Sequence, residues 1–263
     1  MSSNVDHTLQ ILDQFSKQAE SYARVTASFA APRPAALHAL LQPDPNDLAL
    51  EVCCGPGALA LALAPAVRHV TGMDLTPAML EQAKLRQVSS GIGNVDWISG
   101  EIDNIPFEDG RFAIVMCSSA FHHLVRPRHA FREMLRVCRP GGRILIKDVT
   151  PEPEKVERYD ATEKLRDPSH THALTVDEMR ALGSGLEVDE LSFRTIDTPA
   201  VPLEAVLATS FPTECSLDEL RSLFLDDARS GEDRLGYGAV LIDDAVHVRF
   251  RMSTALWRRR LRG

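Results

Sequence analysis

The chain has no excess of positive charge and no long apolar run. Its formal net charge is −8 at pH 7, which disfavours nucleic acid or an anionic membrane as the main partner, because both are negative. No apolar stretch approaches the length of a membrane span, and the first residues, MSSNVDHTLQ, lack the basic and apolar segments of a secretion signal. We therefore expect a cytoplasmic protein that acts on a small molecule, and we leave its oligomeric state open.

Cysteine is sparse, and its spacing suits neither a zinc site nor a disulfide framework. The five cysteines are Cys53, Cys54, Cys117, Cys138 and Cys215. Their number is odd, they contain no C-x-x-C pair, and no pair of histidines is placed to complete a zinc site with them. We expect no bound metal, and we expect most of these side chains to be reduced, buried and apolar in behaviour.

The length of 263 residues fits one elaborated domain. We expect an N-terminal helical lid over residues 1–46, a ligand-binding core over 47–150, and a sheet edge over 151–263. The last of these carries an insertion at about 200–245, and an insertion of that length in a compact domain commonly covers a site.

Short apolar runs alternate with helical stretches from residue 48 onward. Such runs are typical of parallel strands, which are buried on two faces and need not alternate in polarity. The alternation predicts an α/β fold, a Rossmann-like doubly wound sheet with helices on both sides. The expected strands are 48–54, 69–75, 95–101, 112–118 and 143–149, with helices near 58–66, 77–90 and 127–138.

The two ends of the chain add further elements. The N-terminal stretch HTLQILDQFSKQAESYARV predicts a helix with Leu9, Leu12, Phe15, Ala19 and Tyr22 near one face, and a short helix ended by prolines follows it. In the second half, TVDE and SLDE have the spacing of capping boxes, so helices should begin there. The segments LEVDELSFRTID and AVHVRFRMSTALW alternate in polarity and predict an antiparallel hairpin at the sheet edge.

The bend after the first expected strand carries the functional signal. Residues 55–60, GPGALA, fit G-x-G-x-x-G/A between a strand and a helix, an arrangement that turns backbone amides toward a ligand. Alone, the motif also fits a turn that merely reverses the chain. Asp74 closes the second strand at the distance expected of a carboxylate that binds ribose hydroxyls, so together they indicate an adenosine-bearing ligand.

Glu51 selects among such ligands. A carboxylate just before the turn would repel the pyrophosphate of a dinucleotide, whereas it would attract a cationic amino group. S-adenosylmethionine offers an ammonium and a sulfonium and has no phosphate. Gly55 and Gly57 then let the backbone approach the ligand closely, with Cys53 and Cys54 as small walls.

As a set, these segments resemble the motifs of class I S-adenosylmethionine-dependent methyltransferases of the ubiquinone/menaquinone-biosynthesis-like (methyltransferase type 11) group. LEVCCGPG is similar to the first motif and GMDLTPAML to the acidic strand that binds ribose. GEIDNIPFEDGRFAIVMCSSAFHHL is similar to the third and fourth strand ends, and EMLRVCRPGGRILI to the turn into the fifth. The resemblance covers about residues 47–150, and LRDPSHTHALT resembles a segment of a subgroup.

The resemblance implies which residues would hold S-adenosylmethionine. Glu51 and the turn at Gly55 and Gly57 would hold its methionyl end. Asp74 would bind the ribose, and Leu75 and Met79 would lie beside the adenine.

The same resemblance extends to the later strand ends. Glu101 would accept a hydrogen bond from the adenine amino group, Ile102 would offer its backbone amide to the ring, and Ser118 with the residues after it would line the transfer site. Two residues depart from the family pattern, which commonly has glycine at Cys53 and aspartate at Glu101. The cysteine puts the backbone geometry of the first loop in question.

Candidates for chemistry follow the fourth and fifth strands. His122 and His123 lie where a general base would stand if the acceptor is a hydroxyl, an acidic carbon or a protonated amine, although either can equally be a structural residue. Phe121 and His170 are candidates for contact with the acceptor, and turn chemistry explains His170 equally well. By resemblance the first helix folds over the cofactor, which makes Tyr22 a candidate lid residue.

The combined interpretation is a methyltransferase that transfers a methyl group from S-adenosylmethionine to a small-molecule acceptor, a quinol, lipid-like molecule or secondary metabolite, by in-line displacement. The alternative is a fold that binds the cofactor without methyl transfer, as a cyclase or a binding scaffold. A nicotinamide-dependent oxidoreductase is a third hypothesis, and Glu51 argues against it.

Overall fold

The buried runs expected from the sequence form one seven-stranded sheet in the computed structural model, which describes residues 2–29 and 33–261. The strand order is β3-β2-β1-β4-β5-β10-β6, and β10 alone runs antiparallel to its neighbours. The predicted fold class, a mostly parallel Rossmann-like sheet, is confirmed. The parallel core strands are β1 (Leu48–Val52), β2 (His69–Asp74), β3 (Val95–Ser99), β4 (Phe112–Ser118) and β5 (Cys138–Val149).

The expected antiparallel pair is present at the sheet edge. β6 (Val188–Asp197) is the outermost strand and pairs with β10 (Arg251–Arg259), which lies between β6 and β5. The segment predicted as one strand over 245–257 divides in two, because β9 (Ala245–Val248) belongs to a second sheet. The second sheet has the order β7-β9-β8.

Helices cover both faces of the main sheet, because successive residues of each strand point to opposite sides. Leu50 and Val115 pack with buried residues of α5 and α7, whereas Ala49 and Ile114 pack with those of α2 and α3. The helices around the sheet are α2 (Pro34–Leu41), α3 (Ala58–Leu63), α4 (Pro77–Ser90), α5 (Pro127–Val137) and α7 (Val176–Ala181), with short 3-10 turns η1 (Ala64–Ala66), η2 (Ile102–Asn104) and η3 (Phe121–His123).

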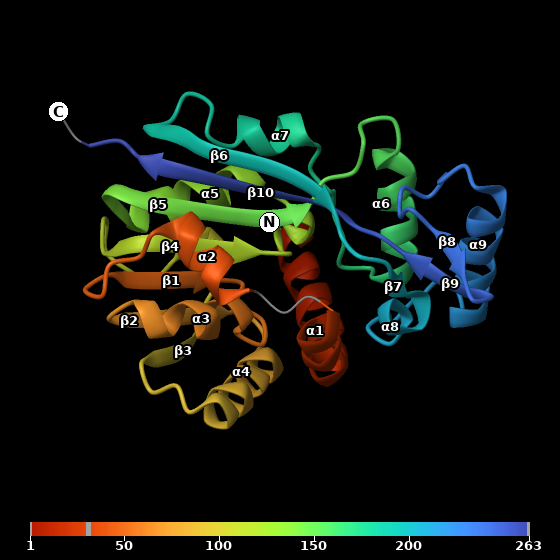
Figure 1. The fold of residues 1–263 in the computed structure, drawn as a ribbon, viewed down its shortest axis with the longest axis horizontal. Helices are drawn as coiled ribbons and strands as arrows, with labels where there is room; N and C mark the ends of the chain where they lie inside the picture. The colour runs from red at the N-terminus through yellow and green to blue at the C-terminus, as the bar shows by residue number, and fades with distance from the viewer. Residues whose placement is uncertain (1, 30–32, 262–263) are drawn as a thin grey trace.

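A second group of elements, here called the cap, lies beyond the carboxyl ends of the parallel strands (Figure 1). It has its own apolar core, which includes Tyr159, Phe224 and Tyr237. Both predicted capping boxes are confirmed, at the starts of α7 and α9. The cap comprises α6 (Val156–Arg166), β7 (Val201–Pro202), α8 (Leu203–Leu207), α9 (Leu217–Ser230), β8 (Val240–Ile242) and β9.

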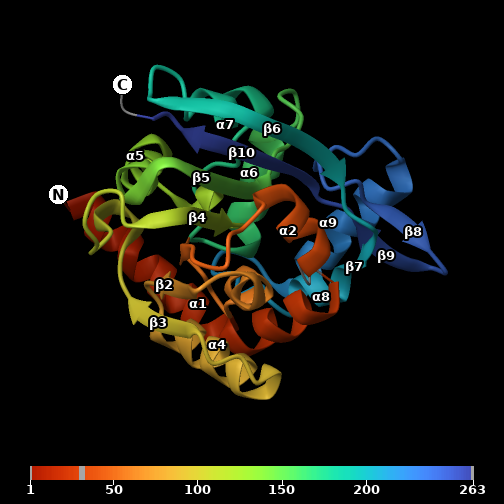
Figure 2. The ribbon, with the colours of Figure 1, turned by 60° about the vertical axis from the view of Figure 1, so that its left-hand side comes forward.

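The N-terminal helix α1 (Ser2–Phe29) crosses the carboxyl ends of the strands between the main sheet and the cap, and it runs beside α4 (Figures 1 and 2). The helix is confirmed, and most of the predicted face is turned inward: Ala19 is buried, and Leu12, Phe15 and Tyr22 are half-buried. Leu9 is the exception at 58% exposed, and Gln14 and Gln18 are buried as well. Both glutamines donate hydrogen bonds from Nε2, Gln14 to the Phe211 carbonyl at 3.2 Å and Gln18 to Asp167 Oδ2 at 3.3 Å. The helix therefore contacts a polar junction, and these two hydrogen bonds connect it to the segments that follow α6 and α8.

The part of the chain that the structure describes contains no helix that is both long enough and apolar enough to cross a membrane.

Trp97 of β3 occupies the space left by two glycines. A Cβ added at Gly57 would lie 2.2 Å from the Trp97 ring, and one added at Gly72 would lie 2.3 Å from it. The indole Nε1 donates to Gln87 Oε1 of α4 at 2.6 Å, which fixes the ring in place. The turn after β1 thus depends on a residue two strands away.

Replacing Gly57 by alanine tests this contact. We expect Gly57→Ala to lower the free energy of unfolding by about 3 kcal/mol, the sum of left-handed strain and overpacking, as measured by urea denaturation. Gly91→Ala is the matched control, because Gly91 also has a positive φ, of +66°, but open space around it. It should cost only about 1 kcal/mol. Equal losses in the two variants would contradict the packing of Trp97 on the turn.

Candidate functional site

The turn between β1 and α3 is built from left-handed backbone. Cys53, Gly55 and Gly57 have φ values of +51°, +50° and +72°, a region in which glycine is free of strain and cysteine is not. The chain therefore keeps, at Cys53, a conformation that favours glycine, at a cost of about 1 kcal/mol. Strain of this kind is typical of ligand-binding turns.

Glu51 lies beneath this turn and is 3% exposed. Its Oε2 accepts a hydrogen bond from the Ala60 amide in the first turn of α3 at 2.7 Å. Burial raises the pKa of Glu51 to about 8, and the nearby Asp74 carboxylate adds to the effect. None of the ion pairs among the described residues includes Glu51, so a cation brought to this point would favour its charged form.

Asp74 ends β2 and joins that strand to the turn. Its Oδ2 accepts from the Gly55 amide at 2.7 Å, and its Oδ1 accepts from the Thr76 amide at 2.9 Å. Burial raises the pKa of this carboxyl although both amides lower it. Each oxygen keeps a second lone pair that can accept from a ligand hydroxyl.

The remaining residues expected at the cofactor gather along the same edge of the sheet. The Gly100 amide donates to the Asp74 carbonyl at 3.1 Å, which brings the loop after β3 beside the loop after β2. Leu75 is half-buried, Met79 and Ile102 are buried, Glu101 is exposed, and Ser118 is half-buried at the end of β4.

Tyr22 of α1 lies over the glycine turn. A Cβ built on Gly55 would be 3.9 Å from Tyr22 Cε1 and 4.0 Å from Met79 Sδ. Burial, together with the carboxylate of Asp148, raises the pKa of the Tyr22 phenol to about 12. The phenol is therefore a neutral hydrogen-bonding group that covers the turn.

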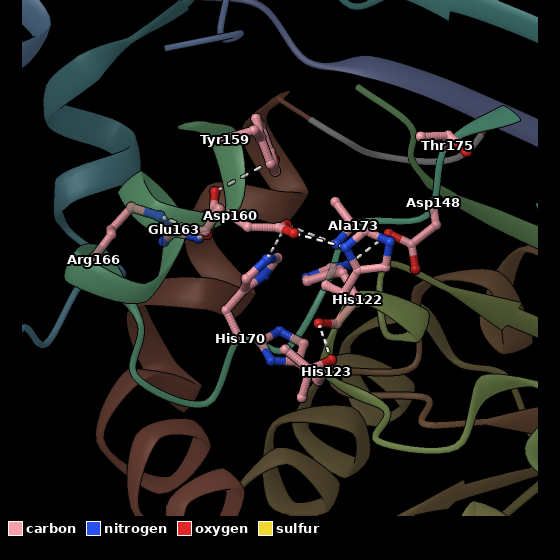
Figure 3. A network of polar contacts seen from close by, with 12 residues as sticks. His122, His123, Asp148, Tyr159, Asp160, Glu163, Arg166, His170, Ala173 and Thr175 are labelled. Atoms are coloured by element: carbon pink, nitrogen blue, oxygen red, sulfur yellow. Dashed lines mark hydrogen bonds and ion pairs between the residues drawn. The ribbon is translucent and has the colours of Figure 1, made fainter. Parts of the chain in front are cut away.

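His122 pairs with a carboxylate that sequence reasoning missed. Its Nδ1 lies 2.6 Å from Asp148 Oδ1, at the end of β5 (Figure 3). Burial disfavours the charged imidazole, but the Asp148 charge outweighs burial and the pKa of His122 lies above its usual value. Since Asp148 accepts from Nδ1–H, the lone pair of His122 is on Nε2, as in a base oriented by a carboxylate.

Asp148 is saturated by hydrogen bonds. Its Oδ2 also accepts from the amides of Ala120 at 3.1 Å and Phe121 at 2.6 Å, and its Oδ1 from the Val149 amide at 2.7 Å. Burial alone would raise its pKa, yet His122 and these amides hold the pKa below the usual value. An acidic residue at the end of the apolar run RILIKDV was the signal for it.

His123 and Phe121 have different environments from His122. His123 Nδ1 lies 3.0 Å from the Ser169 carbonyl, and burial, together with neighbouring His122, lowers the pKa of His123 to about 3. Its imidazole is therefore neutral and held by the fold. The Phe121 ring is buried in the core and its backbone amide donates to Asp148 Oδ2, while its contact with an acceptor stays a prediction.

His170 lies near His122 but is joined to a different carboxylate. The two rings are 5.6 Å apart between centroids, and His170 Nε2 lies 2.7 Å from Asp160 Oδ1 of α6 (Figure 3). The His122 carbonyl accepts from the amides of Thr171 at 2.9 Å and His172 at 3.2 Å. These bonds hold the segment after α6 against η3.

Two further features lie outside this arrangement. Among the described residues no three His, Cys, Asp or Glu side chains gather in a way that could hold a metal ion. A cavity of about 170 Å³ opens beside the cap and is lined by both signs of charge, with Glu152, Lys155 and Arg251 among its residues. It reaches neither the turn nor His122.

Comparison with known proteins places the central segment in a family. Residues 50–146 match the model of a methyltransferase domain. The chain is 32% identical over 157 residues to the uncharacterized methyltransferase YcgJ of Bacillus subtilis (strain 168), which covers 59% of this chain and 61% of that protein. It is 33% identical over 129 residues to a demethylmenaquinone methyltransferase of Clavibacter sepedonicus, which covers 48% of this chain and 52% of that protein. The chain thus spans less than two thirds of the length of both relatives.

Solved structures extend the likeness over most of the chain. A putative methyltransferase from Bacillus halodurans C-125 superposes with a TM-score of 0.75 at 25% identity, covering 87% of this chain and 99% of that one. The crystal structure of the YcgJ protein superposes with a TM-score of 0.72 at 22% identity, covering 88% of this chain and 98% of that one; at that identity the likeness shows the fold alone.

The raised pKa of Glu51 predicts an unusual dependence of stability on pH. Its pKa is about 8 in the folded chain against an ordinary 4.5, so the folded state keeps a proton that the unfolded state has already lost between these values. The native protein should therefore lose stability as pH rises through that window. Glu51→Gln keeps an acceptor for the Ala60 amide and removes the titration.

We compare the free energy of unfolding of Glu51→Gln with that of the native protein, both measured by urea denaturation. The difference, variant minus native, should increase by about 3 kcal/mol between about pH 5 and about pH 9. Parallel stability profiles for the two proteins would show that Glu51 titrates normally.

Proposed function

We propose, on the premise that residues 50–146 are a methyltransferase domain of the class I S-adenosylmethionine-dependent type, that the protein is a methyltransferase acting on a small-molecule acceptor. The observation that carries the proposal is the His122–Asp148 pair, 2.6 Å apart, at the same edge of the sheet as the strained turn and the carboxyls of Glu51 and Asp74. A cofactor site and an oriented base thus share one edge.

The residues of the edge fit S-adenosylmethionine. Glu51 would pair with the ammonium of the methionyl end, because a buried carboxyl without a cationic partner gains most from a cation. Asp74 would accept from the ribose hydroxyls through its remaining lone pairs. Leu75, Met79 and Ile102 would supply the apolar surface for the adenine, and Glu101 would lie at the edge of the adenine ring. The turn beside the methionyl end would be formed by Cys53, Gly55 and Gly57. Ser118 would face the point of methyl transfer.

The chain itself contributes alignment, exclusion of water and a proton acceptor. When bound, S-adenosylmethionine supplies a methyl group activated by its sulfonium. Tyr22 and α1 cover the turn and keep water out. His122 takes the acceptor's proton at Nε2, and Asp148 stabilises the resulting imidazolium. His123 stays neutral and positions the loop.

We propose an acceptor of moderate hydrophobicity, a quinol, lipid-like molecule or secondary metabolite, bound between η3, α1 and the cap within a single domain. The name of the Clavibacter relative, a demethylmenaquinone methyltransferase, supports the quinol among these. The alternative is a cyclase or a binding scaffold that holds the cofactor without methyl transfer, and the experiments below separate the two.

Cofactor binding is tested by calorimetry with S-adenosylhomocysteine, which retains the ammonium. We expect Glu51→Gln to weaken binding by about tenfold or more, because a charge-assisted hydrogen bond is worth about 1.5–3 kcal/mol. Glu108→Gln, at an exposed glutamate paired with Arg111, is the control and should bind normally. Saturating S-adenosylhomocysteine should raise the melting temperature, and protection by NAD instead would favour an oxidoreductase.

Methyl transfer is tested by mass spectrometry with S-adenosylmethionine and a panel of quinols, phenols and amines. We expect a product heavier by one methylene and release of S-adenosylhomocysteine. His122→Gln should lower kcat by about a hundredfold, the usual contribution of a general base. His69→Gln should leave kcat unchanged, because His69 begins β2 and so lies at the end of that strand away from Asp74. Bound cofactor without any methylated product would favour the cyclase or scaffold.

The base should also be visible in the pH profile. Since the pKa of His122 lies above 6.5 and only the neutral ring accepts a proton, kcat/KM should rise with pH through a limb centred above 6.5. His122→Gln should abolish that limb, and a limb that survives the substitution would assign it to another group.

A further inference from the structure

His170 is a buried histidine that the proposed reaction does not use. Its side chain is fully buried, and its Nδ1 has no hydrogen-bond partner among the described residues. Because Nε2–H is held by Asp160 at 2.7 Å, the lone pair of the neutral ring is on Nδ1. Buried polar atoms are nearly always paired in folded proteins, so this nitrogen calls for an explanation.

Asp160 connects His170 to the surface. Its second oxygen, Oδ2, lies 2.7 Å from His172 Nδ1, and His172 Nε2 lies 3.1 Å from Glu178 Oε2. The side-chain exposure increases along this chain, from 0% at His170 to 13% at Asp160, 40% at His172 and 50% at Glu178. Every member can gain or lose a proton.

The inner end of the chain lies beside His122. The centroids of the His122 and His170 rings are 5.6 Å apart and the rings are tilted by 32°. No direct hydrogen bond reaches His170 Nδ1 from the described residues, and one water molecule between the rings would connect this nitrogen to His122 Nε2. His123 is nearer to His122, at 4.2 Å, but its Nδ1 is held by Ser169. Glu163, on the other side of His170, is already paired with Arg166 at 2.6 Å.

We propose that His170, Asp160 and His172 form a proton path that carries the proton from His122 to the surface. The inference rests on the proposed methyl transfer, because that reaction leaves a proton on His122 in every cycle. Direct loss from His122 is hindered, since its side chain is only 13% exposed, against 40% at His172.

Only N–H and O–H bonds change along the path. His122 gives its Nε2 proton through one bridging water to His170 Nδ1, and His170 gives its Nε2 proton to Asp160. His172 releases its Nε2 proton to water, its ring rotates so that the bare nitrogen faces Asp160, and it then accepts the proton on Asp160. The net result is one proton transferred from His122 to solvent, and rotation of the His170 ring restores its first tautomer.

The test measures proton exchange at His122 in the full chain, without any acceptor. Protein labelled with ¹³C-histidine is studied by relaxation dispersion at the Cε1 carbon of His122, at the midpoint of its titration, with and without S-adenosylhomocysteine. His172→Gln keeps a donor for Asp160 but cannot carry a proton. We expect the exchange rate at His122 to fall by about tenfold or more at an unchanged midpoint.

His69→Gln is the control, because His69 also pairs with an aspartate, Asp96, but lies at the opposite end of the sheet; it should leave the rate unchanged. Asp160→Asn serves as a second variant with the same expectation. An unchanged rate in both path variants, or a shifted midpoint without a slower rate, would overturn the proposal. Since no methyl group is transferred, this result is independent of whether the mass spectrometry finds a product.

Discussion

The arrangement of the site depends on the hydrogen bonds that the carboxylate of Asp148 accepts. Asp148 ends β5, yet it binds the backbone of the loop that follows β4, through the amides of Ala120 and Phe121, and the ring of His122. The His122 carbonyl then holds the segment that follows α6. One buried charge thus ties two adjacent strand ends to the approach of the cap, and it does so because four donors compensate for its burial.

The parts of the fold that the sequence predicted well are those with a local cause. The helix over 77–90 begins at a proline and ends at a glycine with positive φ, and both capping boxes are two-residue signals. Buried parallel strands can be recognised in the sequence as continuous apolar runs. The antiparallel pair at the sheet edge was predicted, but the division of residues 245–257 between two sheets was not. Pairing partners in a sheet are chosen by packing over long sequence distances, which the alternation of one segment does not encode.

The site was predictable to the extent that its residues end strands. Glu51, Asp74 and His122 were found in this way, whereas Asp148, which also lies at the end of an apolar run, was not identified. On α1 the burial of Gln14 and Gln18 was not predicted: these residues look solvent-exposed by type, but they are buried because they donate to groups across the junction with the cap. A polar residue is placed by its partner, and the partner is invisible in a one-dimensional pattern.

The three carboxyls at this edge show why its charge favours a cation. Asp148 keeps a pKa below the ordinary value since it faces His122, whereas burial raises the pKa values of Glu51 and Asp74, on which the backbone amides, and for Glu51 also Arg86, have a smaller opposing effect. Ionising the latter two together is costly, because like charges close to one another in a buried place repel strongly. An anionic dinucleotide would increase that cost, and a sulfonium with an ammonium would reduce it. The preference for a positively charged nucleoside is therefore a property of the whole edge of the sheet, and Glu51, which is 3% exposed, is the more buried of the two carboxyls with a raised pKa.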